Sequence, residues 1–210
     1  MQAIIKMKNV AGAATGNCPC EADDFHIAAE IVRKGGVIAY PTESVYGIGC
    51  SPLQISSLQR VLDLKKRNPK KGLIIVAADL DQINCFIDEN RLNDCCRRLM
   101  EKYWPGPYTI ILPARKGLPE LLTGGRDSIA MRVSADDNVR NLCRALDSAV
   151  VSTSCNVSGE ESLTEYHQVI AAFGEHIDFV INRKTGGRKS PSTIIDGLTG
   201  KVLRGKIDNG

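Results

Sequence analysis

Residues 65–78 read Lys-Lys-Arg-Asn-Pro-Lys-Lys-Gly-Leu-Ile-Ile-Val-Ala-Ala, and no other stretch bears more directly on the fold. Five cations occupy its first seven positions, and Gly72 then leads into an apolar run that predicts a buried strand. The cations therefore stand at the entrance of a strand, where a rigid scaffold can hold them. Fixed positive charge at the edge of a core indicates a phosphate-binding site. The competing interpretation is a solvated helix end, because cations there complement the helix dipole.

The whole chain has 210 residues, is 43% hydrophobic and carries a net charge of +3. A chain of this length can bury a full core, and a single domain is the simplest arrangement. The mild net charge argues against a protein that coats nucleic acid, so any anion site must be local. No segment approaches the ~20 apolar residues of a membrane span, and residues 1–10 hold no secretory apolar run. We expect a cytoplasmic protein that makes no contact with a membrane.

Eight cysteines are scattered without the spacing of a disulfide framework, so we expect reduced thiols. Cys18 and Cys20, with His26 nearby, hint at a metal, but a single C-x-C lacks a second pair of ligands. We predict no metal site. Residues 1–20 are predicted to form a flexible N-terminal tail and residues 21–210 the folded domain.

Segments of helical spacing alternate with short apolar runs along the chain. The predicted helices cover about 24–34, 56–66, 79–87, 91–103, 136–146 and 165–173. The predicted strands cover 37–40, 73–78, 108–112, 128–133, 149–153, 179–182, 193–196 and 202–204. This alternation predicts a single α/β domain. The uneven intervals and the late cluster of short strands favour a curved, mixed sheet with flanking helices over a doubly wound sheet.

Polar residues gather near the ends of predicted strands, where α/β proteins place their sites. Residues 40–47 supply hydroxyls, and residues 151–159 supply four hydroxyls and one amide that can donate to phosphate oxygens. Arg132 follows alternating apolar positions and is costly to bury without an anion. In the basic run, Lys65, Arg67 and Lys71 are expected to face the site, with Lys66 and Lys70 in water. Turn, capping and surface salt-bridge chemistry remains the alternative for each segment.

Together these segments describe a cationic, hydroxyl-rich pocket without a histidine base or a metal-ligand cluster. Such a pocket suits phosphoryl or nucleotidyl transfer driven by positioning and charge stabilisation. A serine nucleophile is disfavoured because none of the three histidines lies in a segment suggesting a base. Neither a P-loop nor a Rossmann fingerprint is present.

Read in order, six motifs closely resemble the YrdC-like family of threonylcarbamoyl-AMP synthases, over residues 25 to 206. The motifs are Tyr-Pro-Thr-Glu-Ser-Val-Tyr-Gly (40–47), Lys65-x-Arg67, Trp-Pro-Gly-Pro (104–107), Ala-Met-Arg-Val (130–133), Ser-Thr-Ser-x-Asn (152–156) and Ser-Thr-Ile-Ile-Asp (192–196). Their order and spacing are specific, and the length matches the short, single-domain bacterial form.

The resemblance implies a curved α/β fold with a concave basic cleft, with residues 21–210 as the catalytic domain. It implies that L-threonine, bicarbonate and ATP are joined into L-threonylcarbamoyl-adenylate with release of pyrophosphate. A threonylcarbamoyl-transferase complex then modifies adenosine 37 of tRNAs that read codons beginning with A. Mg²⁺ is expected on the triphosphate, since the sequence shows no acidic cage.

The resemblance also assigns roles, residue by residue. The catalytic group would be Lys65, Arg67, Ser154 and Asn156. ATP would contact Arg67, Lys71, Ser128, Ser154, Asn156 and Arg204. Threonine would contact Thr42, Ser44, Arg132 and Ser192. Two departures stand out: Val76 occupies the place of a histidine that touches threonine in many long relatives, and Cys155 replaces the usual alanine between the serine and the asparagine.

Two alternatives remain at this point. A non-catalytic RNA-binding protein of tRNA or ribosome maturation would grip phosphates with the basic run, and its affinity would fall steeply with salt. The chain has only four Phe, five Tyr and one Trp for base stacking, and weak tRNA binding could coexist with catalysis. A carbamoyl-adenylate-forming domain of hydrogenase maturation shares the fold, but its acylphosphatase and zinc-finger regions are absent from this sequence.

Overall fold

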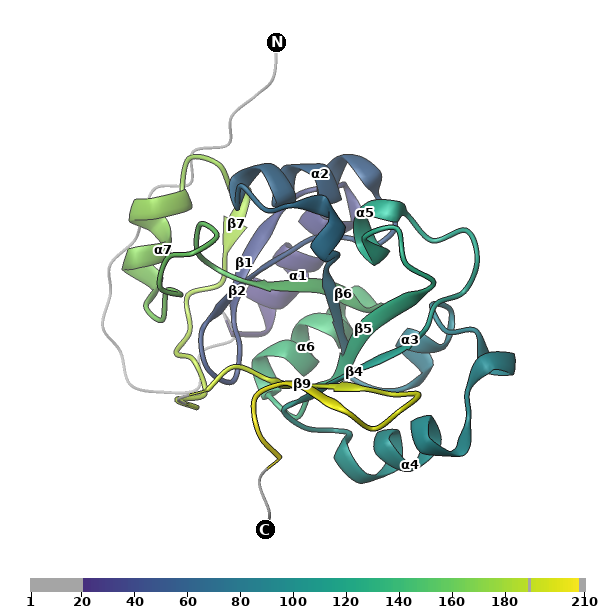
Figure 1. The fold of residues 1–210 in the computed structure, drawn as a ribbon. Coiled ribbons are helices and arrows are strands. Elements are labelled where there is room, and N and C mark those ends of the chain that lie inside the picture. Colours follow the sequence, from purple (N-terminus) through teal and green to yellow (C-terminus); the bar gives the residue numbers. More distant parts are fainter. Residues whose placement is uncertain (1–20, 189, 208–210) are drawn as a thin grey trace.

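The structure, a computed structural model, describes residues 21–188 and 190–207 (Figure 1). The predictions for residues 1–20, including the Cys18 and Cys20 pair, lie outside the described residues. In the part that is described, no helix combines the length and the apolar character needed to cross a membrane.

Within the described residues, nine strands form one sheet in the order β7-β1-β2-β6-β3-β5-β4-β8-β9. The pairs β1/β7, β3/β5 and β4/β8 are parallel, and the remaining neighbours are antiparallel. The predicted α/β fold with a mixed sheet is therefore confirmed. The strands are β1 (Ile38–Pro41), β2 (Tyr46–Gly49), β3 (Ile74–Ala77), β4 (Tyr108–Pro113), β5 (Ser128–Val133), β6 (Val150–Ser154), β7 (Phe179–Val180), β8 (Thr193–Asp196) and β9 (Val202–Arg204).

Helices cover both faces of this sheet (Figure 1). They are α1 (Glu21–Arg33), α2 (Ile55–Leu64), α3 (Asp81–Asn84), α4 (Asp94–Tyr103), α5 (Glu120–Thr123), α6 (Asp137–Leu146) and α7 (Tyr166–Phe173), with 3₁₀ turns at Pro69–Lys71 and Glu89–Arg91. Strand β2 is absent from the sequence prediction, which has a turn over residues 41–47. Gly47 and Gly49 weaken the local preference for a strand. Hydrogen-bonded pairing with β1 and β6 stabilises the strand in spite of this weak local preference.

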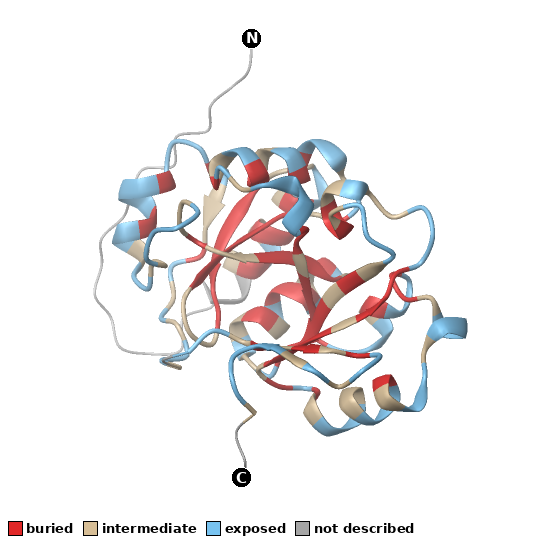
Figure 2. Cartoon of the chain, in the orientation of Figure 1, coloured by how far each residue is buried: buried red, intermediate tan, exposed pale blue. Residues whose placement is uncertain are grey.

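Alternate residues of the central strands enter two separate cores, and Figure 2 shows that the central strands are largely buried. In β3, Ile75 and Ala77 belong to the core that α2, α5 and α7 cover, whereas Val76 belongs to the core beneath α1 and α6. This follows from strand geometry, since successive side chains point to opposite faces.

The face beneath α1 and α6 is only partly covered. Ile74 lies two residues from Val76 and therefore on the same face, yet it lines an open cavity while Val76 is fully buried. The floor of the cavity and the second core are thus neighbouring parts of one sheet face.

Candidate functional site

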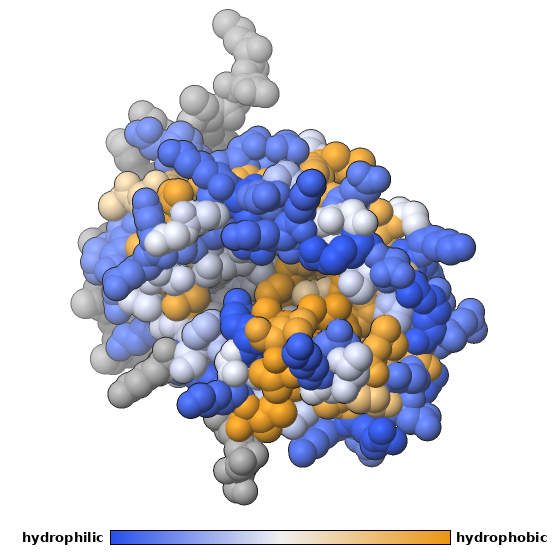
Figure 3. All heavy atoms as spheres, viewed as in Figure 1, coloured by the Kyte–Doolittle hydropathy of each residue, from blue (hydrophilic) through white to orange (hydrophobic). Residues whose placement is uncertain are grey.

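The cavity has a volume of about 320 Å³ and is lined by residues from both ends of the sequence, from Thr42 to Arg204. Eight serine and threonine side chains and three arginines line it, with no Asp or Glu among the described lining residues. In Figure 3 the face that carries the cavity is hollowed near its centre. The lining offers many hydrogen-bond donors and positive charge, which is the complement of an anion.

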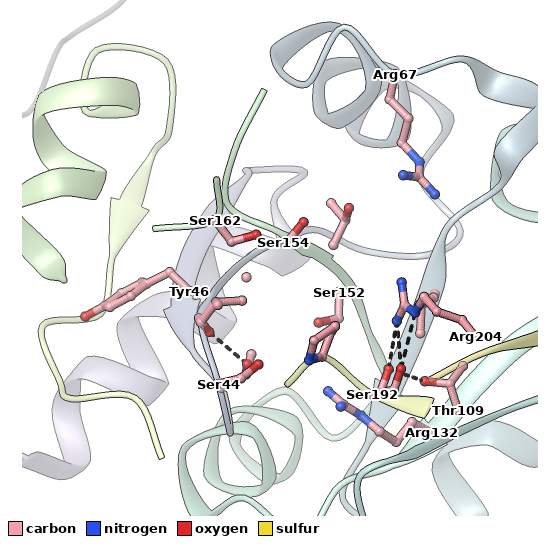
Figure 4. A pocket seen from close by; sticks show the side chains of 16 residues that line it. Ser44, Tyr46, Arg67, Thr109, Arg132, Ser152, Ser154, Ser162, Ser192 and Arg204 are labelled. Atoms are coloured by element: carbon pink, nitrogen blue, oxygen red, sulfur yellow. Dashed lines mark hydrogen bonds between the residues drawn. The ribbon is translucent and has the colours of Figure 1, made fainter. Parts of the chain in front are cut away.

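The three arginines approach the cavity from different elements. Arg67 follows α2, Arg132 lies in β5 and Arg204 ends β9, and Figure 4 shows their guanidinium groups converging on the same space. Burial lowers the pKa of Arg67, and repulsion from Arg204 and Arg126 lowers it further. Burial likewise lowers the pKa of Arg204, with repulsion from Arg132. A polyanion in the cavity would relieve this repulsion.

The chain after α2 is built to aim Arg67. Lys66 takes a left-handed backbone conformation with φ 48°, and the Asn68 side chain caps the 3₁₀ turn that follows. The Arg67 Nε and Nη2 atoms donate to Gly72 O at 3.2 and 3.1 Å. Gly72 has φ +62°, and a Cβ there would approach Leu122 O to 2.9 Å, so the turn that holds Arg67 requires glycine.

Lys65 points inward, as the sequence predicts, but its ammonium is used within the protein. The side chain is only 2% exposed. Its Nζ donates to Asn156 O at 2.8 Å, to Asn156 Oδ1 at 2.9 Å and to Ser154 O. These three acceptors match the three donors of an ammonium. Burial lowers the pKa of Lys65 to about 8, with repulsion from Arg67 adding to the shift and Cys155 opposing it.

The loop after β6 is therefore fastened from beneath by Lys65. Ser154 Oγ donates to Asn156 Oδ1 at 2.7 Å, and Asn156 Nδ2 donates to Glu160 O at 2.7 Å. Ser154 lines the cavity, whereas Lys65 and Asn156 do not. Of the four predicted catalytic residues, the structure places Arg67 and Ser154 at the cavity and the other two directly behind it.

All four residues predicted to contact threonine line the cavity: Thr42, Ser44, Arg132 and Ser192. Ser192 is held by Thr109 Oγ1 at 2.9 Å and by Arg204 Nη2 at 3.2 Å. Arg132 is 8% exposed, and its Nη2 lies 3.2 Å from Glu43 Oε2. The predicted ATP residue Arg204 and the predicted threonine residue Ser192 are thus direct neighbours.

Besides Asn156, two predicted ATP contacts lie outside the cavity lining. Lys71 is exposed, as are Lys66 and Lys70, and Ser128 is half-buried at the start of β5. Neither Lys71 nor Ser128 lines the cavity, so the expectation that Lys71 faces the site together with Arg67 does not match the structure. The reason is the 3₁₀ turn over Pro69–Lys71, which has no buried residue. Contact of either residue with ATP stays a prediction.

Two lining residues, Thr109 and Ser152, have no individual role in the sequence prediction, although Ser152 lies in the hydroxyl-rich segment 151–159. Thr109 is fully buried in β4 yet polar, and Ser152 stands two residues before Ser154 on the same strand. Both follow from strand periodicity once the face of the site is known. Val76, at the place of the family histidine, lies in the second core and not in the cavity wall. Cys155 is fully buried, and burial raises the pKa of its thiol to about 12.

Comparison with known proteins gives concordant matches. A family model for Sua5, YciO and YrdC, described as "Telomere recombination", matches residues 30–205. The chain is 44% identical over 177 residues to threonylcarbamoyl-AMP synthase of Idiomarina loihiensis, across 84% of this chain and 95% of that protein.

Two solved structures share the fold with recognisable sequence similarity. Sua5 of P. abyssi, solved in complex with L-threonine, is 32% identical with a TM-score of 0.78 over 84% of this chain and 51% of that one. E. coli YciO is 29% identical with a TM-score of 0.73 over 83% of this chain and 84% of that one. The chain thus spans about half the length of the P. abyssi protein.

Proposed function

The chain belongs to the Sua5/YciO/YrdC family, and we propose that it is a threonylcarbamoyl-AMP synthase, which forms L-threonylcarbamoyl-adenylate and pyrophosphate from L-threonine, bicarbonate and ATP. The observation that carries this proposal is that Arg67, Arg132 and Arg204 converge on one cavity. Hydroxyl groups line this cavity, and none of its described lining residues is Asp or Glu. Bicarbonate and ATP are anions at neutral pH, and threonine carries a carboxylate, so each reactant presents negative charge to these arginines.

The cavity divides into two sides by the groups that line it. Arg67 and Ser154 stand together on the side of α2 and β6, where we place the triphosphate. Arg132 and Ser44 stand on the other side, where we place threonine, with the planar guanidinium of Arg132 facing the carboxylate. Figure 4 shows Arg204 and Ser192 between Arg67 and Arg132, and we place the junction of the two substrates there. The threonine complex of the P. abyssi protein supports an amino-acid site in this fold.

The reaction needs little covalent chemistry from the protein. The amine of threonine attacks the carbon of bicarbonate and water leaves, which gives N-carboxy-threonine. Its new carboxylate then attacks the α-phosphorus of ATP, and pyrophosphate leaves. Because the second step joins two anions, the guanidinium groups cancel their repulsion and stabilise the charge that develops on pyrophosphate. The hydroxyl proton of Ser154 is donated to Asn156 Oδ1, so Ser154 contributes by fixing the loop after β6, and other lining hydroxyls such as that of Thr153 add neutral hydrogen bonds to the phosphates.

In this proposal Lys65 and Asn156 act indirectly, from behind the cavity wall that Ser154 forms. They hold the backbone of the Ser154 loop so that its donors meet the phosphates. A direct contact of either residue with the nucleotide remains an expectation from the family resemblance. The same holds for Lys71 and Ser128.

Mg²⁺ enters this scheme as part of the substrate, MgATP. The described residues contain no group of three or more His, Cys, Asp or Glu that could hold a metal ion, and the described cavity lining offers no carboxylate, the usual protein ligand of Mg²⁺. The phosphates themselves supply its oxygen ligands. We expect the product to pass to a threonylcarbamoyl-transferase complex acting on tRNA in the cytoplasm.

The test is a pyrophosphate-release assay with protein, MgATP, bicarbonate and threonine. We expect release that depends on both threonine and bicarbonate, and a product that contains labelled threonine joined to AMP. Omission of bicarbonate, with carbon dioxide excluded, is the matched control. If release is independent of threonine, the proposed function is wrong. Salt-sensitive RNA binding without any release would instead favour the RNA-binding alternative.

A further inference from the structure

Glu43 stands behind Arg132 and is not a lining residue of the cavity. Its Oε2 lies 3.2 Å from Arg132 Nη2, and the two side chains are 15% and 9% exposed. An ion pair this well shielded from solvent is screened far less than a surface pair. The strand β5 and the turn between β1 and β2 supply the two partners, so the pair links distant parts of the chain.

Ser134 fixes the carboxylate of Glu43. Its hydroxyl is fully buried and donates to Glu43 Oε1 at 2.6 Å. Ser134 Oγ also accepts from Asp136 N at 3.1 Å, and Ser134 N donates to Ala77 O at 3.0 Å. An ionised carboxylate can only accept hydrogen bonds, so the single hydroxyl proton of Ser134 is donated to Glu43 while the Ser134 oxygen accepts from Asp136 N. Ser134 therefore sets the orientation of Glu43.

The contact uses only one edge of the guanidinium. Among the described residues, Arg132 Nε has no hydrogen-bond partner, and Glu43 Oε2 meets Arg132 as an ion pair without hydrogen-bond geometry. Figure 4 shows the guanidinium reaching toward the side of the cavity on which Ser44 lies. The pair thus leaves donors of Arg132 for a ligand while it restricts the swing of the side chain.

We propose that Glu43 is a positioning residue for the amino-acid substrate, which holds Arg132 so that its free donors meet the carboxylate of threonine, with Ser134 fixing Glu43 in turn. This inference rests on the proposed function. It names two residues, Glu43 and Ser134, that act through Arg132 without touching substrate.

Two effects of the Glu43 charge oppose each other. A carboxylate beside Arg132 weakens the attraction of the guanidinium for any anion. The same carboxylate fixes the plane of the guanidinium, and recognition of a carboxylate by two parallel bonds depends on that plane. Because Arg132 is only 8% exposed, the orientation of its guanidinium governs which of its donors a ligand in the cavity can reach. Loss of Glu43 should therefore weaken threonine binding.

The experiment compares Glu43→Gln, Ser134→Ala and the double variant with the unaltered protein. Glutamine keeps the size of the side chain and the backbone bonds that Thr42 O and Glu43 O accept from Gly186 and Arg188. We expect the KM for threonine to rise tenfold or more in Glu43→Gln and several-fold in Ser134→Ala, with the KM for ATP within twofold. Since Ser134 acts through Glu43, the double variant should be no worse than Glu43→Gln.

Glu30→Gln is the matched control, because Glu30 also pairs with an arginine but at an exposed position. Its two KM values should be unchanged. A threonine-induced rise in melting temperature, measured without ATP, is the second readout. It should shrink in Glu43→Gln, and it reports on the amino-acid site even if no pyrophosphate is released.

Three results would overturn the inference: a threonine KM within twofold of the unaltered protein in a folded Glu43→Gln variant, an equal rise of both KM values, or a double-variant effect equal to the product of the single effects. Ser134→Ala provides the same comparison if Glu43→Gln does not fold. Absence of threonine-dependent pyrophosphate release from the unaltered protein, with an intact threonine-induced melting shift, would reject the proposed function and not the role of Glu43.

Discussion

Replacing Lys65 with methionine should remove most of the turnover and leave the protein folded. Methionine has a similar reach but no charge and no donor. In the structure Lys65 Nζ serves Ser154 O, Asn156 O and Asn156 Oδ1. The variant therefore releases the loop after β6 without altering any side chain that lines the cavity.

The expected change in stability is small because two contributions oppose each other. Asn156 O loses its donor, which costs about 1–3 kcal/mol, and the other two acceptors each lose one bond worth ~0.5–1.5 kcal/mol while they keep Asn156 N and Ser154 Oγ. Against this, burial lowers the pKa of Lys65 from 10.5 to about 8, so removing the cation regains about 3 kcal/mol near neutral pH. The net change in the free energy of unfolding lies between about −1 and 3 kcal/mol.

The loss of activity should be much larger than that. Without Lys65, the donors of the Ser154 loop are no longer fixed before the reaction, and removal of one positioned donor in comparable sites costs on the order of 10²–10³ in rate. The assay is threonine-dependent pyrophosphate release at saturating substrates, beside a thermal melt. Lys70→Met is the matched control, since Lys70 is exposed and lies in the same basic run.

The reasoning fails if Lys65→Met stays folded and keeps more than about a third of the turnover. It also fails if Lys70→Met loses as much activity as Lys65→Met. In that case the positive charge of the run as a whole, and not the fastening of one loop, would be what matters.

Three further outcomes are expected. Arg67→Gln should raise the KM for ATP about tenfold or more, because that is the usual contribution of a charge-assisted hydrogen bond. The KM for threonine should stay within twofold. Initial-rate kinetics measure both constants, and an equal rise in both would contradict the assignment of Arg67 to the nucleotide. The turnover number should fall as pH rises through about 8, the pKa of Lys65. The protonated ammonium donates to three acceptors, whereas the neutral amine has only two N–H donors. A pH profile at saturating substrates measures this, and a turnover number that stays constant up to pH 9 would exclude it. Cys155→Ala should keep its turnover within twofold and lose about 1 kcal/mol of stability, because the buried thiol stays protonated; kinetics and a thermal melt test it, and a hundredfold loss of activity in a folded variant would show that the thiol has a chemical role.

The sequence predicts the fold class and most of the cavity, because both depend on patterns that survive in one dimension. The family resemblance carried by the ordered motifs implies that Thr42, Arg132 and Ser192 share one site, and all three line the cavity. Strand β2 escapes prediction because its two glycines have little strand preference of their own and because one of its two pairing partners, β6, is distant in sequence.

Directions of side chains within the basic run are harder to predict. A charge pattern does not distinguish a cation that faces a ligand from one that serves backbone carbonyls, and Lys65 is of the second kind. Lys71 is the last residue of the 3₁₀ turn Pro69–Lys71, which has no buried residue, and residue types alone do not reveal that turn. The sequence does not predict a role for Glu43, because that role depends on contacts with Ser134 and Arg132, some ninety residues away.

The floor and the rim of the cavity differ in how freely they can change during evolution. Gly47, Ile74 and Ser152 form the floor from paired strands, and Ile74 stands two residues from the fully buried Val76. A new side chain on the floor must therefore satisfy the packing of a neighbouring core. The rim around Pro191 and Ser192 lies in the segment before β8, and a new side chain there does not have to pack against a buried core. Adaptation to another amino acid would proceed through rim substitutions, and the rim is where a library for altered substrate choice should be built.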